Sequence, residues 1–228
     1  MAIRPIFVPK LEGSCLVEIK DIEFEWYPGF SVSQKKKSMA ALHAAYIFEN
    51  PEAKILEVSS KSDLELGISL SAFNLTIQTN SDRKVTVESM FQSSKVFTKG
   101  GPFKDILYKT SREAKKDERI KNSGQLIRFE HQGEHWELEP KTAFYDWIYL
   151  NALNLNSNLK EEALNYNAFT DIEFNPKKSI NCQAYSLALY VSLEKRKLLQ
   201  KDSIPPKDEF LKMISNFKIE NTSDKPLI

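Results

Sequence analysis

The sequence predicts a single α+β domain that is mainly helical and has a few short strands. Most apolar stretches repeat at helical spacing, and only a few alternate as in a strand. Hydrophobic residues make up 41% of the 228 residues, which is enough to bury a core. No internal repeat or clear linker divides the chain. We therefore expect residues 1–200 to form the domain and residues 201–228 to add a C-terminal helix and a polar tail packed on it.

Strands and helices are expected to alternate in the N-terminal half. In order, they are a strand or strand pair over 15–26, a helix over 33–48, a short strand over 54–58, a short helix after residue 62, an extended segment over 72–79 and a helix from 86 to about 97. Met39 and Leu42 lie on one face of the first helix, with Ser33 as its candidate N-cap. Ser62 and Glu65 have the spacing of a capping box.

The C-terminal half is expected to be mostly helical. In order, its elements are a charged, solvated helix over 109–122, a hairpin over 125–138, helices over 141–155 and 158–166, an extended segment over 170–176, and helices over 179–199 and 206–217. Gly133 supplies the hairpin turn, and Pro176 ends the extended segment.

Composition argues against several classes of protein. The formal net charge is only +1, which disfavours binding of nucleic acid by bulk positive charge but allows a local basic patch. Gly is scarce, with 7 residues, and the chain has no Walker loop, nucleophile elbow or dinucleotide-binding turn. No cofactor is therefore predicted.

The same composition bears on metal sites and location. Cys15 and Cys182 are far apart and are expected to be free thiols of a reducing cytoplasm. Together with His43, His131 and His135 they have no zinc-ligand spacing, so no metal site is predicted. No stretch reaches the roughly 18–20 apolar residues of a membrane span, and the N-terminus lacks the apolar core of a signal peptide. We expect a cytoplasmic protein without a membrane partner.

The segment TVESMFQSSKVF carries the first candidate site. On a helix, Glu88, Gln92 and Lys95 lie at i, i+4 and i+7, within about 40° of one another around the axis. One interpretation is a Glu–Lys pair that faces solvent. The apolar flanks favour a packed helix, which would hold these groups in a cleft. A desolvated lysine with a lowered pKa is a nucleophile, and a desolvated carboxyl group acts as an acid or base near neutral pH.

Two further segments place polar groups beside aromatic rings. In LELGISLSAFNL, the residues Ser71, Phe73 and Asn74 form either a loop with one buried Phe or a site for sugar hydroxyls beside an aromatic wall. In AFYDWIYL, Asp146 and Trp147 belong either to a core helix with an exposed Asp or to an aromatic shelf for a nucleobase with Asp146 at its edge.

The segment TDIEFNPKKSINCQ combines carboxylates and amides. If its first part is extended, Asp171, Glu173 and Asn175 point to one side, which suits hydroxyl binding, acid–base chemistry or a surface edge strand. Asn181 and Gln183 begin an otherwise apolar helix. Because buried amides need hydrogen-bond partners, a polar pocket is expected beneath this helix.

In their order and spacing these segments resemble a known family. The run S-x-F-N from Ser71 to Asn74, followed by V-E-x-x-F-Q-x-x-K from Val87 to Lys95, looks like the NADAR or YbiA-like domain. The chain is most similar to the NADAR branch encoded beside DarT-type DNA ADP-ribosyltransferase toxins. The resemblance covers most of residues 4–195. Its matching stretches are SSKSDLELGISLSAFNL, VESMFQSSKVFTKGGPF, FYDWIYLNAL and TDIEFNPKKSINCQA.

The resemblance implies a YbiA-like, mainly helical fold and N-glycosidase activity. For this branch it implies removal of ADP-ribose from guanine bases of DNA, as the antitoxin to the partner toxin. Glu88 matches the acidic residue of the family's E-x-x-F/Y-Q-x-x-K segment, and Lys95 matches its lysine. Ser89 stands where the broader family has His, and the family's Asp-x-x-Trp-Gly segment is not found cleanly here.

The implied reaction assigns roles to these residues. Protonated guanine leaves ribose C1″ more easily, and an amine can displace it as a Schiff base that water then hydrolyses. We therefore expect Lys95 to be the nucleophile and Glu88 the general acid and base. The expected ligand-binding residues are Ser71, Phe73, Asn74, Gln92, Asp146, Trp147, Asp171 and Glu173. Either of the last two would position ribose hydroxyls.

The expected partners are ADP-ribosylated single-stranded DNA, ADP-ribose and, as genetic partner, a DarT-type toxin. Lys35–Lys37 and Lys115–Lys116 are either phosphate contacts or ordinary solvated lysines. Two alternatives stay open. An N-glycosidase for a small-molecule N-glycoside would use the same residues, and a non-catalytic module would bind ADP-ribose or the toxin itself.

Overall fold

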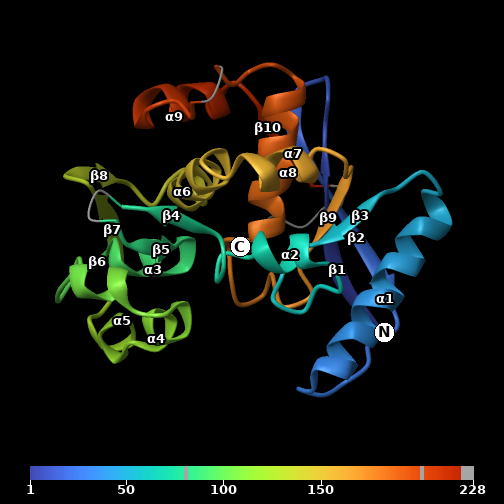
Figure 1. Ribbon diagram of the computed structural model, residues 1–228, viewed down its shortest axis with the longest axis horizontal. Coiled ribbons are helices and arrows are strands. Elements are labelled where there is room, and N and C mark those ends of the chain that lie inside the picture. Colours follow the sequence, from blue (N-terminus) through green and yellow to red (C-terminus); the bar gives the residue numbers. More distant parts are fainter. Residues whose placement is uncertain (80–81, 201–202, 222–228) are drawn as a thin grey trace.

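The longest strands of the protein pair at its N-terminal end. The computed structural model describes residues 1–79, 82–200 and 203–221. Within them, β1 (Ala2–Pro9) runs antiparallel to β2 (Cys15–Phe24). β9 (Ala168–Thr170) and β3 (Ile55–Glu57) extend this sheet beyond β1, and β10 (Lys218–Asn221) pairs with the outer side of β2 (Figure 1). β2 and β3 were predicted, whereas β1 was not.

Helices cover both faces of this sheet (Figure 1). Ile6 packs in a cluster with Met39 and Leu42 of α1 (Val32–Glu49). Phe7, the next residue of β1, instead packs in the larger core to which α8 (Gln183–Lys195) contributes. Because successive side chains of a strand point to opposite faces, the sheet lies between α1 and α8.

A second group of elements lies on the side of α8 away from α1 (Figure 1). The helix α6 (Ala143–Asn154) packs against both α8 and α3 (Val87–Ser93). Beside them, β6 (Lys95–Phe97), β7 (Leu126–His131) and β8 (Glu134–Trp136) form an antiparallel sheet. The rings of Phe91, Phe129 and Phe144 stack where these elements meet.

Shorter elements complete the described residues. They are α2 (Glu65–Ser69), β4 (Thr76–Gln78), β5 (Lys84–Thr86), the 3-10 helix η1 (Lys104–Tyr108), α4 (Ser111–Lys116), α5 (Glu118–Asn122), α7 (Ser157–Ala163) and α9 (Lys207–Ser215). α9 buries Phe210 and packs on α6, while most of the expected polar tail lies outside the described residues. None of the described helices is long and apolar enough to cross a bilayer.

The mixed α+β fold class is confirmed, but two predictions near the candidate site are wrong. The helix capped by Thr86 ends at Ser93, so Lys95 is the first residue of β6 and not part of that helix. The expected extended segment over 170–176 is a turn after Thr170, because Asp171 accepts backbone N–H groups from residues two and three positions ahead.

The expected helix caps also need correction. Ser31 caps α1 in place of Ser33, and its hydroxyl accepts the N–H of Gln34 at 3.3 Å. The Ser62–Glu65 capping box does not form, because α2 begins only at Glu65 and the Ser62 hydroxyl accepts the N–H of Leu64. These corrections shift the helix starts by a few residues and leave the order of elements intact.

Candidate active site

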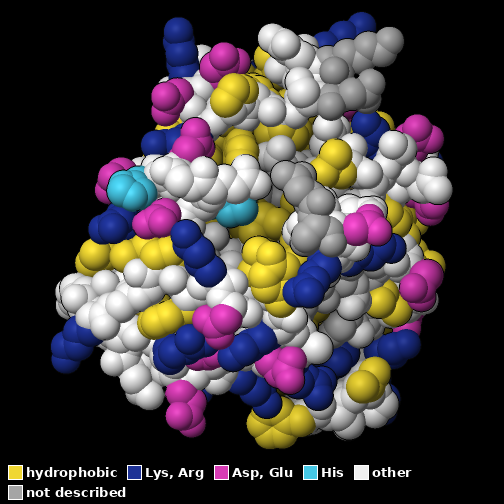
Figure 2. Space-filling model, turned by 60° about the vertical axis from the view of Figure 1, so that its left-hand side comes forward, with side chains coloured by type: hydrophobic (Ala, Val, Ile, Leu, Met, Phe, Trp, Pro, Cys, Tyr) yellow, Lys and Arg dark blue, Asp and Glu magenta, His cyan; other side chains and the backbone are white. Residues whose placement is uncertain are grey.

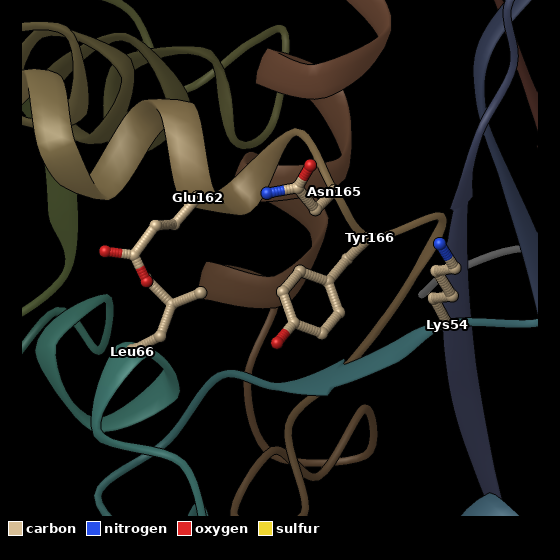
Figure 3. Close-up of a pocket in the computed structure, with 5 residues that line it drawn as sticks. All are labelled: Lys54, Leu66, Glu162, Asn165 and Tyr166. Carbon is tan, nitrogen blue, oxygen red and sulfur yellow. The ribbon is translucent and has the colours of Figure 1, made fainter.

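A cleft of about 1540 Å³ opens between the two groups of elements. Its walls come from α3 and β6, the turn after α2, α4, the start of α6 and the segment that follows β9. A second hollow, of about 270 Å³, lies elsewhere, between β3, α2 and α7 (Figure 3). It is lined by Lys54, Leu66, Glu162, Asn165 and Tyr166, and it shares no residue with the cleft.

The helix α3 holds a carboxylate and an amide on the wall of the cleft. Thr86 caps the helix by accepting the N–H of Ser89 at 3.1 Å, and every residue of α3 is buried. Glu88 Oε1 accepts a hydrogen bond of 2.9 Å from Gln92 Nε2. Glu88 Oε2 has no hydrogen-bond partner among the residues that the structure describes. Gln92 is only 6% exposed, and its Oε1 is a buried acceptor without a partner there as well.

Lys95 lies beside this pair on the first position of β6. Its Nζ lies 4.6 Å from the centroid of the Phe91 ring. In the described part of the chain it forms no hydrogen bond or ion pair. Loss of water around the amine lowers the pKa of Lys95 to about 8; the negative charge of Glu88 opposes this shift, and the positive charge of Lys115 adds to it. A substantial fraction of the amine is therefore neutral near pH 8.

The turn after α2 supplies the neighbouring wall. Ser71 is buried, and its hydroxyl donates to the carbonyl of Ile68 at 2.8 Å. The Asn74 amide donates to the same carbonyl at 2.9 Å. The Phe73 ring is partly exposed and lies 5.1 Å from Lys115 Nζ. All three residues that the sequence singled out here line the cleft.

The turn after β9 faces the cleft from another side. Asp171 and Glu173 both line it. Asp171 Oδ1 accepts the N–H groups of Glu173 and Phe174, at 3.0 and 3.2 Å, which fixes the turn. Burial raises the pKa of Asp171, and the nearby Glu57 carboxylate raises it further. Glu173 pairs with Lys35 at 3.2 Å and is half-exposed.

Gln183 joins three of the segments that line the cleft. Its Oε1 accepts the N–H of Ala72 at 2.6 Å, and its Nε2 donates to the carbonyl of Val58 and to Asp171 Oδ2. The carbonyl of Ala72 in turn accepts the N–H of Glu88 at 2.9 Å. A continuous hydrogen-bonded path therefore runs from Asp171 through Gln183 and the Ala72 peptide to the backbone of Glu88.

A buried carboxyl group supports the turn from behind. Glu57 accepts hydrogen bonds from Ser59, from Thr170 at 2.7 Å and from the N–H of Ile172 at 2.8 Å. The Thr170 hydroxyl is also 2.8 Å from His43 Nε2. Burial lowers the pKa of His43 to about 4, with weak opposition from Asp63, so the imidazole is neutral near pH 7. The turn that carries Asp171 is thus tied to both β3 and α1.

The comparison with protein families agrees with this geometry. The model of the DarT1-associated NADAR antitoxin family matches residues 2–224 of the chain. The chain belongs to this family. No curated protein matches it. The resemblance that the sequence motifs suggested is therefore confirmed at the level of the family.

Asp146 and Trp147 are not part of the cleft wall. Asp146 was expected at an exposed edge but is 3% exposed, and the Ser186 hydroxyl of α8 donates to it. Burial raises the pKa of Asp146 to about 7. The Trp147 indole donates to the carbonyl of Pro205 at 2.9 Å and packs on Trp136. Both side chains point away from the cleft because α6 turns this face toward α8 and α9.

The structure also shows which residues of the cleft the sequence did not indicate. Gln183 was noted only as an amide in need of partners, and Glu57 received no role. Tyr145 lines the cleft, with its ring edge-on to Phe91 at 5.1 Å. Its position next to Asp146 on the same helix gave no signal of this. Ser89, in place of the broader family's His, donates to the carbonyl of Lys109 and does not line the cleft.

The described residues can also be compared with the donor sets of metal sites. The residues that the structure describes contain no group of three or more His, Cys, Asp or Glu side chains arranged to hold a metal. The groups that line the cleft near Lys95 are instead a carboxylate, two amides and an amine. This donor set is suited to proton transfer and to binding of hydroxyl groups.

Proposed function

We propose that the protein is an N-glycosidase that removes ADP-ribose from guanine bases of DNA and so acts as the antitoxin to a DarT-type ADP-ribosyltransferase. One observation carries this proposal: Glu88 and Lys95 line the same cleft, with the carboxylate held by Gln92 and the pKa of the amine lowered. The cleft, of about 1540 Å³, exceeds the roughly 300–1000 Å³ of ordinary small-molecule sites. It therefore has room for ADP-ribose and for the nucleotide attached to it.

The reaction begins at the anomeric carbon, ribose C1″. The neutral Lys95 amine attacks C1″ as the bond from C1″ to the guanine nitrogen breaks. Glu88 accepts the proton that the attacking amine loses and passes it to the departing guanine nitrogen. Opening of the ribose ring moves the remaining amine proton to the ring oxygen and leaves a Schiff base between Lys95 and C1″.

Water completes the reaction. Glu88, now a carboxylate, accepts a proton from a water molecule that adds to the Schiff-base carbon. Collapse of this adduct returns the amine to Lys95 and releases ADP-ribose, while guanine remains in the DNA. The net change is the addition of one water molecule across the glycosidic bond, so no oxidant or reductant is required. Glu88 thus serves both half-reactions.

The remaining cleft residues are proposed to hold the substrate. Gln92 is proposed to hold Glu88 in position, since its Nε2 donates to Glu88 Oε1. The Phe73 ring offers a surface for a base, and Ser71 and Asn74 fix the turn that carries it. Asp171 and Glu173 are proposed to orient ribose hydroxyls. Asp146 and Trp147 are left out of this set because they lie outside the cleft.

The decisive experiment is incubation with single-stranded DNA that carries ADP-ribosylated guanine, followed by detection of free ADP-ribose and of the restored oligonucleotide. Small N-glycosides are compared in parallel. Faster release from the DNA supports the proposal, whereas release from the small compounds alone would indicate a metabolite N-glycosidase. Tight binding without any release would leave only a binding module.

Trapping tests the covalent route. Borohydride reduces a Schiff base, so treatment during turnover is expected to leave an ADP-ribose adduct on Lys95 that peptide mass spectrometry locates. The Lys95→Ala variant serves as the control. If wild-type protein gives no adduct and Lys95→Ala is fully active, the amine is not the nucleophile.

A further inference from the structure

Seven basic and five acidic side chains line the cleft, so its lining carries a net charge of +2, but many of the basic side chains have no acidic partner among the described residues. Apart from Lys95, the cleft-lining cations whose side chains form no ion pair or hydrogen bond within the described residues are Lys61, Arg112, Lys115, Lys141, Lys177 and Lys178. Figure 2 shows several Lys and Arg side chains close together in the lower half of the view, with Asp and Glu side chains among them. A local group of unpaired basic side chains is typical of a surface that binds a polyanion.

This charge is unevenly distributed around the opening. Arg112 and Lys115 are exposed on α4, and Lys177 and Lys178 are exposed on the segment between the Asp171 turn and α8. The exposed carboxylates of Glu137 and Glu139 line the cleft from the segment between β8 and α6, where Lys141 offsets part of their charge. Two of the three segments are therefore basic, and the third is weakly acidic.

The lysines of α1 do not share this character. Lys35 pairs with Glu173 at 3.2 Å, and Lys36 pairs with Asp63. Neither of the two lines the cleft. Because their charge is largely neutralised, Lys35 and Lys36 fit the interpretation as ordinary surface lysines better than the interpretation as phosphate contacts.

We propose that a single DNA strand crosses the mouth of the cleft along a strand-binding rim formed by Arg112, Lys115, Lys177 and Lys178, with its phosphodiester groups held by these side chains. The inference rests on the proposed function, which it deepens by assigning the surface that distinguishes DNA from a free nucleotide. Lys115 marks the inner end of the rim, since its charge acts on Lys95 and its ammonium lies over the Phe73 ring. Phe73 thereby offers a stacking surface beside a phosphate contact.

The DNA on the rim is inferred to be single-stranded because the reacting groups lie deep in the cleft. Glu88 is only 6% exposed, so the glycosidic bond must enter the cleft to reach it. A base inside a duplex cannot do this without being unstacked and unpaired. An acidic surface of a protein is the other occupant that a basic rim could accept, and the experiment below separates it from DNA.

The test is the salt dependence of binding to a fluorescent single-stranded oligonucleotide with one ADP-ribosylated guanine. Four phosphate contacts predict a slope of log K against log salt of about −3 for single strands, hence roughly 50-fold weaker binding at 200 mM than at 50 mM salt. For the double variant Lys177→Ala, Lys178→Ala, binding is expected to weaken by only about 7-fold between 50 mM and 200 mM salt. Arg112→Ala is expected to give an intermediate slope.

A matched control removes two exposed lysines from the far end of α8. Lys195 lies roughly 18 Å along the helix from Gln183. Lys195→Ala with Lys197→Ala changes the net charge by the same amount as the rim variant. It is expected to keep the wild-type slope, because neither side chain lines the cleft. If control and rim variants shift the slope equally, net charge alone is responsible and the rim is contradicted.

Free ADP-ribose forms the second arm, because its diphosphate has the same chemistry as the DNA backbone. The rim variant is expected to lose at least fivefold more affinity for the modified oligonucleotide than for free ADP-ribose. Equal losses would assign Lys177 and Lys178 to the diphosphate and overturn the strand assignment. If the rim variant loses binding to the purified toxin while its salt dependence of DNA binding is unchanged, the rim binds a protein and not DNA.

The outcome is separable from that of the proposed function. Suppose that wild-type protein releases no ADP-ribose but binds the oligonucleotide with a salt dependence of about −3, and that the rim variant reduces this dependence. The assignment of the rim to DNA is then supported, and the glycosidase proposal is contradicted. If wild-type protein is active and the rim variant keeps the wild-type slope, the rim fails and the glycosidase proposal stands. If wild-type protein neither binds nor acts on the oligonucleotide, both fail.

Discussion

Two walls of the cleft carry the candidate functional residues, and they are built in different ways. One wall consists of α3 and β6, in which Glu88 is held by helix geometry and Lys95 by the strand pair with Phe129. The other is the turn after β9, where hydrogen bonds that the Asp171 carboxylate accepts, one of them from Gln183, replace regular secondary structure. The reacting groups lie on the regular wall. Rigid elements hold catalytic groups more accurately than loops do, whereas loops adapt to the substrate.

Removal of the amine from the regular wall is expected to have the largest effect. Lys95→Ala should lower single-turnover release of ADP-ribose by about 10³-fold or more, because the nucleophile is lost. Lys95→Arg keeps the positive charge but stays protonated, so it should be nearly as inactive. Substantial activity of the Arg variant would indicate that only charge is required at this position.

The next effect is expected from the carboxylate. Glu88→Gln should slow turnover by about 10²-fold or more, the scale of a lost general acid or base. The substituted amide can still accept the hydrogen bond from Gln92, so the melting temperature and ADP-ribose binding by calorimetry should stay close to wild type. Near-normal turnover would remove Glu88 from the chemistry.

The third prediction connects the two walls through Gln183. Gln183→Leu leaves the N–H of Ala72 and the carbonyl of Val58 without their partner, which should lower the free energy of unfolding by about 1–3 kcal/mol. Displacement of Glu88 and Asp171 should also lower kcat by on the order of 10-fold to 100-fold. Ser186→Ala, which disturbs α8 one turn further along, serves as the control for a purely structural loss.

A smaller effect is expected from pH. Because the folded protein lowers the pKa of Lys95 to about 8, the neutral fraction of the amine rises as pH increases through this value. Between pH 7 and pH 8 this fraction grows about fivefold, from roughly one tenth to one half. The rate of the covalent step, measured by rapid quench, should rise accordingly and level off above pH 9. A rate that falls over this range would contradict attack by the neutral amine.

The smallest effect is expected at a predicted ligand residue that lies outside the cleft. Asp146 contacts Ser186 in the core and does not line the cleft. Asp146→Asn keeps the shape of the side chain and should leave kcat/KM within about twofold, while any change appears in the melting temperature. A large loss of kcat/KM without a loss of stability would return Asp146 to the ligand site.

The sequence predicted the composition of the cleft better than its geometry. Glu88 and Lys95 were brought together by an assumed continuous helix, yet Lys95 belongs to β6. The pairing of this short strand with β7, some thirty residues later, is a long-range contact that local periodicity does not encode. The Asp171 turn was missed for a similar reason, because alternation of Asp, Ile, Glu and Phe looks identical in a strand and in this turn.

The elements with strong local signals were predicted well. α1, α6 and the hairpin of β7 and β8 follow from apolar spacing and from Gly133. The role of Gln183 needed the structure, because its partners Val58, Ala72 and Asp171 come from three distant parts of the chain. Sequence alone indicated only that such an amide requires partners.

The orientation of Gln92 has a consequence for selectivity. Its amino group is committed to Glu88, and its oxygen is a buried acceptor without a partner among the described residues. A compound whose O–H or N–H reaches this oxygen gains a hydrogen bond that an analogue without that group does not gain, a difference of about 1–3 kcal/mol. Discrimination of roughly 5-fold to 150-fold between two nearly identical compounds can thus arise from one amide oxygen.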